Sequence, residues 1–244
     1  MLTRAWSRSR GLCTKCWARC NTRVTPRSTK GVPRSSERPR ATTACPAELF
    51  QATARGRVGG TMRGMELRTE RLILREFRFD DEVAVHQYGS DAEVTRYTTW
   101  GPNSPADTVA YLSRVVREAS GETRTSFTLA VATLDDELIG ATSLTITDTQ
   151  STGELGYVLA RDQWGHGYAT EVARRLVVFG FDELGLHRIT ATCHPDNLAS
   201  ARVLEKAGMH FEGTIRDHLR VREVWRDSRV FAIAARDEGA VHSD

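Results

Sequence analysis

Long apolar runs are missing from this sequence of 244 residues. No stretch approaches the roughly 20 apolar residues that a membrane-spanning helix needs. The amino-terminal residues also lack the apolar segment of a secretory signal. We therefore expect neither a membrane anchor nor a secretory signal.

Cysteine is scarce in most of the chain. Four of the five cysteines lie within the first 64 positions, and only Cys193 lies beyond them. A single cysteine excludes a disulfide framework there and fits a reducing compartment, which we take to be the cytoplasm. Cys13 and Cys16 have the spacing of a zinc knuckle, but Cys20 and Cys45 do not form a matching second pair. We expect no metal site.

Acidic residues are almost absent from the first 64 positions. This segment holds 14 Lys and Arg but two acids, a net charge of +12, whereas residues 65–244 hold 20 basic and 29 acidic residues, a net charge of −9. Its large apolar residues are few, so burial cannot offset the entropy of ordering the backbone. We expect a disordered basic extension over 1–64, a folded domain over 65–237 and a flexible tail over 238–244.

Three interpretations of the basic extension compete. An Arg-rich, acid-poor segment resembles an organelle transit peptide. It could instead bind nucleic acid through its charge, a role that we do not expect elsewhere in the chain. We favour an upstream extension without a role, because a recognisable domain opening begins at Met65.

Strand and helix patterns alternate beyond Met65. Ser104 followed by Pro105 is typical of a helix start, and the apolar spacing over 168–184 gives the clearest helix pattern of the chain. The order is one strand, helices, three antiparallel strands, a helix, a strand, a helix and closing strands. Strands are expected at 71–77, 126–133, 137–147, 154–160, 187–194, 211–215 and 228–235, and a further short helix at 199–207.

A glycine pair precedes the long predicted helix. Gly165 and Gly167 allow a positive φ and a close approach of the backbone to a ligand. The free N–H groups at the start of the helix would favour an anion such as a pyrophosphate. A plain tight turn has the same local pattern. Further along, Asn197 could cap the short helix, and Ser200 could be an ordinary residue of its first turn.

Taken in order, these segments resemble the GNAT superfamily of acetyl-CoA-dependent N-acetyltransferases, and more closely its RimJ/RimL-like branch of ribosomal-protein N-terminal acetyltransferases. Two positions depart from the family pattern. Trp164 stands where Arg or Gln is usual, and Leu219, next to His218, stands where some relatives have a catalytic Glu. The matching segments lie at 71–75, 154–157, 164–171, 197–200 and 205–209.

The resemblance implies an α/β acyl-CoA N-acyltransferase fold, with a mixed, mostly antiparallel sheet flanked by helices. Acetyl-CoA would lie between two splayed parallel strands, the fourth and fifth, at 154–160 and 187–194. Lys206 would either approach its 3′-phosphate or remain solvated. The implied cofactor-binding residues are Val158, Leu159, Ala160, Trp164, Gly165, His166, Gly167, Tyr168, Ala169, Thr170, Asn197 and Ser200.

The resemblance also implies direct attack of an amine on the thioester, with Ser200 as the acid that protonates the leaving thiolate. Our candidate for the base is Glu154, which could alternatively just cap a strand edge. His194 and His218 are further candidates for the base or ordinary surface residues. Cys193 fits the inward face of its strand and is interpreted as core rather than as a nucleophile.

The acceptor site is expected near 97–103 and 214–226, with Tyr97 and Trp100 lining it, although Trp100 could instead anchor its own loop. The net charge of −9 suits a cationic acceptor. The leading hypothesis is the amino terminus of a ribosomal or other protein or peptide. The rivals are a small amine, such as a polyamine or aminoglycoside, and a non-catalytic acyl-CoA-binding module. Monomer and homodimer both remain open.

Overall fold

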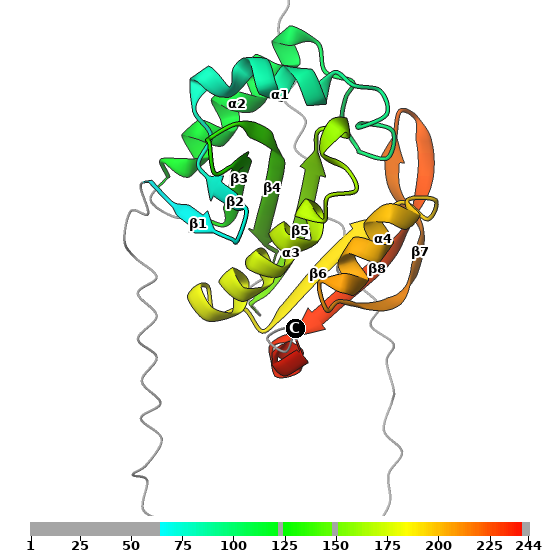
Figure 1. Ribbon diagram of the computed structural model, residues 1–244. Coiled ribbons are helices and arrows are strands. Elements are labelled where there is room, and N and C mark those ends of the chain that lie inside the picture. Colours follow the sequence, from blue (N-terminus) through cyan, green and yellow to red (C-terminus); the bar gives the residue numbers. More distant parts are fainter. Residues whose placement is uncertain (1–63, 122–123, 148–150, 241–244) are drawn as a thin grey trace, which may run out of the picture. The chain divides into compact units, whose positions relative to one another are not determined.

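The structure is a computed structural model that describes residues 64–121, 124–147 and 151–240 (Figure 1). The predicted basic extension, except Gly64, and the last four residues of the predicted tail lie outside the described residues. Within the described part of the chain, no helix is long and apolar enough to cross a membrane.

Eight strands, four α-helices and several short helical turns make up the described residues. The strands are β1 (Glu66–Arg68), β2 (Leu72–Arg75), β3 (Ser126–Thr133), β4 (Leu138–Ile146), β5 (Thr152–Leu159), β6 (Arg188–Cys193), β7 (His210–Val221) and β8 (Val224–Ala234). The α-helices are α1 (Glu82–Gly89), α2 (Pro105–Ala119), α3 (Tyr168–Val178) and α4 (Leu198–Lys206). The short turns are η1 (Phe79–Asp81), η2 (Arg161–Gln163), η3 (Phe179–Glu183) and η4 (Ala235–Ala240).

All eight strands form one sheet in the order β1-β2-β3-β4-β5-β6-β8-β7. Every neighbouring pair is antiparallel except β5 and β6, which run parallel. This arrangement confirms the predicted mixed sheet, and the predicted fourth and fifth strands correspond to β5 and β6. Figure 1 shows β5 and β6 crossing the middle of the molecule, with α3 and α4 beside them.

Helices cover both faces of the sheet. The larger core packs α3 and α4 against one face, with Leu176 and Leu204 fully buried. The smaller core packs α1 and α2 against the other face through Val85, Leu112 and their neighbours. Because successive strand residues point to opposite faces, the central strands β3, β4 and β5 contribute to both cores.

The start of α2 follows the prediction closely. Ser104 is the N-cap, its side chain accepts a hydrogen bond from the backbone N–H of Asp107, and Pro105 is the first helical residue. The side chain of Asp107 accepts the backbone N–H of Ser104 in return, at 2.9 Å. This capping box fixes the point at which the loop before α2 ends.

Three predicted elements have different bounds in the structure. The first strand is a hairpin of β1 and β2, not one strand over 71–77. The helix over 168–184 is α-helical only as far as Val178 and continues as the π-helical turn η3, where Gly180 packs closely against β6. The closing strands β7 and β8 are longer than predicted, because their exposed polar residues hide the strand period and two bulges interrupt it.

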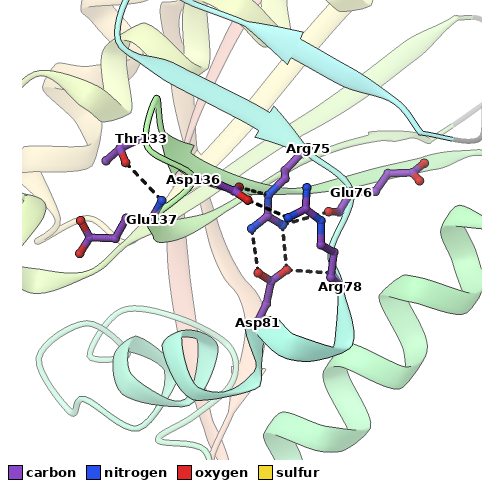
Figure 2. Close-up of polar contacts among 7 residues, drawn as sticks. All are labelled: Arg75, Glu76, Arg78, Asp81, Thr133, Asp136 and Glu137. Atoms are coloured by element: carbon purple, nitrogen blue, oxygen red, sulfur yellow. Dashed lines mark hydrogen bonds and ion pairs between the residues drawn. The ribbon is translucent and has the colours of Figure 1, made fainter.

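A buried ion pair fastens η1 to the sheet (Figure 2). The guanidinium of Arg75 on β2 makes two parallel bonds to the carboxylate of Asp81, at 2.9 and 2.8 Å. Its Nε donates to Asp136 in the turn between β3 and β4 at 2.6 Å, and Arg78 binds the other oxygen of Asp136. The network therefore holds the start of α1, the end of β2 and the β3–β4 turn together.

Candidate functional site

The parallel strands β5 and β6 pair only over their first residues. The registered pairs are Thr152 with Arg188, Gly153 with Ile189, and Glu154 with Thr190. Both strands continue beyond this point, each bonded on its outer side to an antiparallel neighbour. The two strands therefore separate after Glu154 and Thr190, and the gap that the family resemblance implied opens at this point of the sheet.

The backbone of β5 divides between its neighbour β4 and the gap. The N–H of Ala160 donates to the carbonyl of Ile139 at 2.8 Å, so that N–H belongs to the β4 side. Along an antiparallel pair, the N–H and C=O groups of alternate residues point toward the partner strand and away from it. Ala160 bonds to β4, so the backbone groups of Tyr157 and Leu159 point away from β4, toward the gap. Of the predicted backbone ligands Val158, Leu159 and Ala160, Leu159 thus turns its N–H toward the gap, while its carbonyl oxygen accepts the indole N–H of Trp164.

A tyrosine that the sequence analysis did not select spans the base of this gap. The hydroxyl oxygen of Tyr157 lies 2.9 Å from Oγ of Ser200 in the first turn of α4. It also lies 3.2 Å from the carbonyl oxygen of Ser200. Burial raises the pKa of Tyr157 above its ordinary value, so the phenol stays protonated at neutral pH. Tyr157 and Ser200 therefore form a linked pair of neutral hydroxyl groups.

Glu154 lies on the other face of β5. Leu155 and Leu159 belong to the core beneath α3, and strand alternation points Glu154 to the opposite side, where it is exposed. Oγ1 of Thr192 on β6 lies 3.5 Å from a carboxylate oxygen of Glu154. The two side chains face each other where the strands separate. A carboxylate and a pair of hydroxyl groups thus border the gap from opposite faces of the sheet.

The predicted glycine loop follows η2 and leads into α3. Gly165 and Gly167 have φ angles of +83° and +81°, and Gly167 occupies the N-cap position of α3. No side chain caps this helix, so the N–H groups of its first residues can bind an external anion. A side chain built on Gly165 would meet no atom within 4 Å, so this side of the loop is open.

Trp164 anchors the glycine loop to the end of β5. Its indole Nε1 donates to the carbonyl oxygen of Leu159 at 3.0 Å, while the ring stays half exposed. The next residue, Gly165, then begins the open turn. The structure gives this tryptophan a role in holding the loop, and its exposed ring lies at the surface of the site.

Asn197 caps α4, as predicted. Its Oδ1 accepts a hydrogen bond from the backbone N–H of Ser200 at 3.1 Å. The amide nitrogen of the Asn197 side chain is thereby turned away from the helix and can donate to a ligand. Cys193 at the end of β6 is buried, and burial raises the pKa of its thiol.

The loop before α2 contacts the far side of the gap. The ring of Tyr97 stacks on His194, with ring centroids 5.0 Å apart. Arg222, in the turn between β7 and β8, donates to the carbonyl oxygen of Gly101. The two segments expected to border the acceptor, 97–103 and 214–226, therefore meet. Trp100 lies partly exposed within the first of them.

His218 lies in a bulge of β7. Between the pairs Ile215 with Ser228 and Leu219 with Arg226, three residues of β7 face one residue of β8. Asp217 in this bulge has a φ of +47°. Nδ1 of His218 is buried without a hydrogen-bond partner among the described residues. His218 is thus half-buried, with one nitrogen of its imidazole covered and unbonded.

Two features of the site gave only weak signals in the sequence. Tyr157 has the pattern of any strand aromatic, and its partner Ser200 is 43 positions away. Thr69 precedes the first predicted strand and Arg71 begins it, and both bind Glu171 about 100 positions away. Among the residues that the structure describes, no cluster of three His, Cys, Asp or Glu side chains could hold a metal ion.

Comparison with known proteins agrees with this geometry. The profile of the acetyltransferase (GNAT) domain matches residues 71–210. The uncharacterized N-acetyltransferase YnaD of Bacillus subtilis is 35% identical over 69% of this chain and 96% of its own length. The uncharacterized N-acetyltransferase p20 of Bacillus licheniformis is 31% identical over 70% of this chain and 97% of its own. A crystal structure of a GNAT-family acetyltransferase from Bacillus anthracis, 33% identical, covers 70% of this chain and 98% of its own with a TM-score of 0.63.

Proposed function

Because the chain belongs to the acetyltransferase (GNAT) family and is an N-acetyltransferase, we propose that it moves the acetyl group of acetyl-CoA to the α-amine of a protein or peptide. The observation that carries the proposal is the gap between β5 and β6, which opens beside an uncapped helix start. A long ligand with an extended arm and a charged pyrophosphate matches both parts. The resemblance of the motifs to RimJ/RimL-like enzymes supports a ribosomal-protein terminus as the acceptor.

Acetyl-CoA would use the two parts of the site differently. The pantetheine arm would extend between the strands, bonding the backbone of β5 near Leu159 and the side-chain amide of Asn197. The pyrophosphate would accept hydrogen bonds from the N–H groups of residues 165–169, where the positive end of α3 favours negative charge. The N–H of Thr170 already donates to the carbonyl oxygen of Gly167 at 3.1 Å, so this residue would contribute through its side chain. The thioester would then lie where the strands part, between Glu154 and Ser200.

The arrangement supports direct transfer of the acetyl group. The amine nitrogen attacks the thioester carbonyl, a C–N bond forms, and the C–S bond breaks. An alkylammonium is mostly protonated near pH 7, so it must first lose a proton. We propose that Glu154, which is exposed on the sheet face opposite Ser200, accepts that proton directly or through water. His194 and His218 lie in the segments that border the same face and remain the alternative bases.

The thiolate that leaves needs a proton from the other side, and Ser200 is the proposed donor, whose Oγ then regains a proton from solvent. Ser200 lies on the face opposite Glu154 and is held by Tyr157. When the Tyr157 hydroxyl donates to Oγ, the Ser200 proton is free to point toward the sulfur. The same contact fixes the rotamer of Ser200 before the reaction begins, which lowers the entropy lost on reaching the transition state.

A small cationic amine is the second candidate acceptor, because the net charge of residues 65–244 is −9 and attracts cations of any size.

The site lies next to a free, buried cysteine, Cys193. That thiol supports placing the enzyme in a reducing compartment such as the cytoplasm.

Thiol release from acetyl-CoA by the full-length protein tests the proposal. The acceptors are short peptides with free Ala, Ser or Thr termini, polyamines and aminoglycosides. Turnover on peptides, with kcat about 10-fold to 100-fold lower in Glu154→Gln and Ser200→Ala, is the expected result. The matched controls are Glu137→Gln, in the turn between β3 and β4, and Ser113→Ala, on α2.

Each other outcome has a definite meaning. Turnover on polyamines or aminoglycosides alone would replace the acceptor class and keep the reaction. Coenzyme binding without turnover on any acceptor would favour a binding module over an enzyme. No binding of acetyl-CoA at all would overturn the proposal.

A further inference from the structure

Glu171, in the first turn of α3, binds a segment that lies a hundred positions earlier in the chain. One carboxylate oxygen accepts a hydrogen bond from the hydroxyl of Thr69 at 2.6 Å and another from the backbone N–H of Arg71 at 2.9 Å. The other carboxylate oxygen accepts a hydrogen bond from Nε of Arg71 at 2.8 Å and forms an ion pair with Nη2 of the same guanidinium at 2.6 Å. Both oxygens of this carboxylate are therefore fully engaged, and they fix the guanidinium of Arg71 in one orientation.

The fixed guanidinium contacts the glycine loop along three consecutive residues. Nη1 of Arg71 donates to the carbonyl oxygen of His166 at 3.0 Å. Its Cζ lies 4.7 Å from the centroid of the Tyr168 ring, which also stacks on His166. Nη2 lies 3.6 Å from the point where a Cβ on Gly167 would be. The side chain of Arg71 thus packs along residues 166–168 of the loop.

This contact determines where a backbone N–H points. A trans peptide is planar, and its C=O and N–H groups point in opposite directions. The carbonyl of His166 points toward Arg71, so the N–H of Gly167 in the same peptide points away from it, to the open side of the loop. Without this hold, residues on both sides of a positive-φ glycine could rotate at little energetic cost.

We propose that Arg71 and Glu171 are positioning residues for the coenzyme, which hold the loop over 165–168 so that its N–H groups face the pyrophosphate. The inference rests on the proposed function. Arg71 itself is not a phosphate ligand, since Glu171 neutralises its charge and takes up two of its three nitrogens.

The first test measures coenzyme binding by calorimetry and steady-state kinetics on the full-length protein. Arg71→Ala is expected to raise the Kd of CoA and the KM for acetyl-CoA by about tenfold, the loss of roughly one charge-assisted hydrogen bond. It should leave kcat at saturating acetyl-CoA within about twofold, because the reacting groups lie elsewhere. Thr69 and the backbone N–H of residue 71 still bind Glu171 in this variant, so the fold is retained.

A shortened donor separates positioning from general damage. Acetyl-pantetheine lacks the pyrophosphate, so Arg71→Ala should leave its kcat/KM unchanged. An equal loss of kcat/KM with acetyl-CoA and with acetyl-pantetheine would show that the contact is purely structural, and it would overturn the inference. An unchanged Kd for CoA would overturn it as well.

Glu171→Gln distinguishes the two ways in which Arg71 could act. If Arg71 positions the loop, releasing it by Glu171→Gln should weaken CoA binding about as much as Arg71→Ala does. The double variant should then bind CoA about as weakly as either single variant. If Arg71 were a phosphate ligand restrained by Glu171, releasing it would tighten CoA binding, and the proposal would be wrong.

Arg114→Ala is the matched control. Arg114 also pairs with a glutamate, Glu118, and lies over a tyrosine ring, that of Tyr111, but on α2. This variant should not change CoA binding. Failure of the wild-type protein to bind CoA would instead count against the proposed function, so the two failures are distinguishable.

Discussion

The hydroxyl groups of Tyr157 and Ser200 lie 2.9 Å apart and link β5 to α4 across the gap in the sheet. Because Tyr157 is buried and its pKa is raised, its hydroxyl remains a hydrogen-bond donor well past neutral pH. A buried, neutral donor next to a serine is suited to fixing the direction of the serine hydroxyl. Tyr157 therefore acts through Ser200 and need not touch the thioester.

Tyr157→Phe removes that contact and keeps the ring. We expect kcat to fall about tenfold, the kinetic equivalent of one lost hydrogen bond. The KM for acetyl-CoA should change by less than about twofold, because the interaction acts in the chemical step. Tyr111→Phe, at a partly buried position of α2 that packs against the smaller core, is the control and should leave kcat unchanged. An unaltered kcat in Tyr157→Phe would leave Ser200 without a positioning partner.

Gly167→Ala tests the conformation of the glycine loop. An added Cβ would have room, because its nearest neighbour lies 3.6 Å away, so the effect comes from the φ of +81°. We expect a stability loss of about 1 kcal/mol and a rise of the KM for acetyl-CoA as the loop shifts.

Gly185→Ala supplies the matched comparison. Gly185 has a φ of +65° and open space around it, but lies after η3. The same loss of stability should appear in unfolding curves, with the KM for acetyl-CoA unchanged. Equal KM values for the two variants would contradict the role of the loop.

Local sequence patterns predicted those elements whose signals are local. The capping residues Ser104 and Pro105 and the apolar spacing in α3 marked helices that the structure confirms. The strands of the β7–β8 hairpin were underestimated, because most residues of β7 are exposed and have no apolar alternation. β1 was missed because it has three residues, of which only Leu67 is buried.

Contacts between distant residues could not be predicted in this way. The sheet order brings β2 beside β3 and places Arg71 against the start of α3, and no local period encodes that neighbourhood. The same holds for Tyr157 on β5 and Ser200 on α4, which lie 43 positions apart in the chain. The glycine loop was found from the sequence, whereas the residues that hold it were found from the structure.

The buried ion pair of Arg75 and Asp81 should be essential for stability. Their side chains are 7% and 6% exposed, against 52% and 40% for the surface pair Arg114 and Glu118. Asp81→Asn leaves the buried guanidinium with the half-exposed Asp136 as its remaining counter-charge and should lower the free energy of unfolding by about 3 kcal/mol. Glu118→Gln should lower it by about 0.5 kcal/mol or less. Chemical denaturation measures both, and equal losses would contradict this assignment.

Asp136 should make a pH-dependent contribution to stability. Hydrogen bonds from Arg75 and then Arg78 lower the pKa of Asp136 below its ordinary value. The folded state therefore favours the charged form, and the stabilisation is complete above the unfolded pKa of about 3.9 and lost as pH falls through the folded pKa.

Asp136→Asn isolates this contribution. Asn tolerates the φ of +64° at this position, so the backbone should not be strained. Because the carboxylate is half exposed, we expect a loss of about 0.5–1 kcal/mol at pH 7, and the difference from the wild type should shrink below about pH 4. A difference that stayed constant with pH would attribute the loss to packing rather than to charge.

Cys193→Ala tests whether the acetyl group passes through the protein. The thiol lies at the end of β6, beside the gap, and is the one cysteine among the described residues. Burial raises its pKa, so it is protonated at neutral pH and a poor nucleophile. Direct attack of the amine on acetyl-CoA needs no such intermediate. We therefore expect kcat within about twofold of the wild type and a stability loss of about 1 kcal/mol. Initial rates should fit a sequential mechanism in both proteins. Loss of turnover in Cys193→Ala, together with ping-pong kinetics in the wild type, would instead require an acetyl-cysteine intermediate.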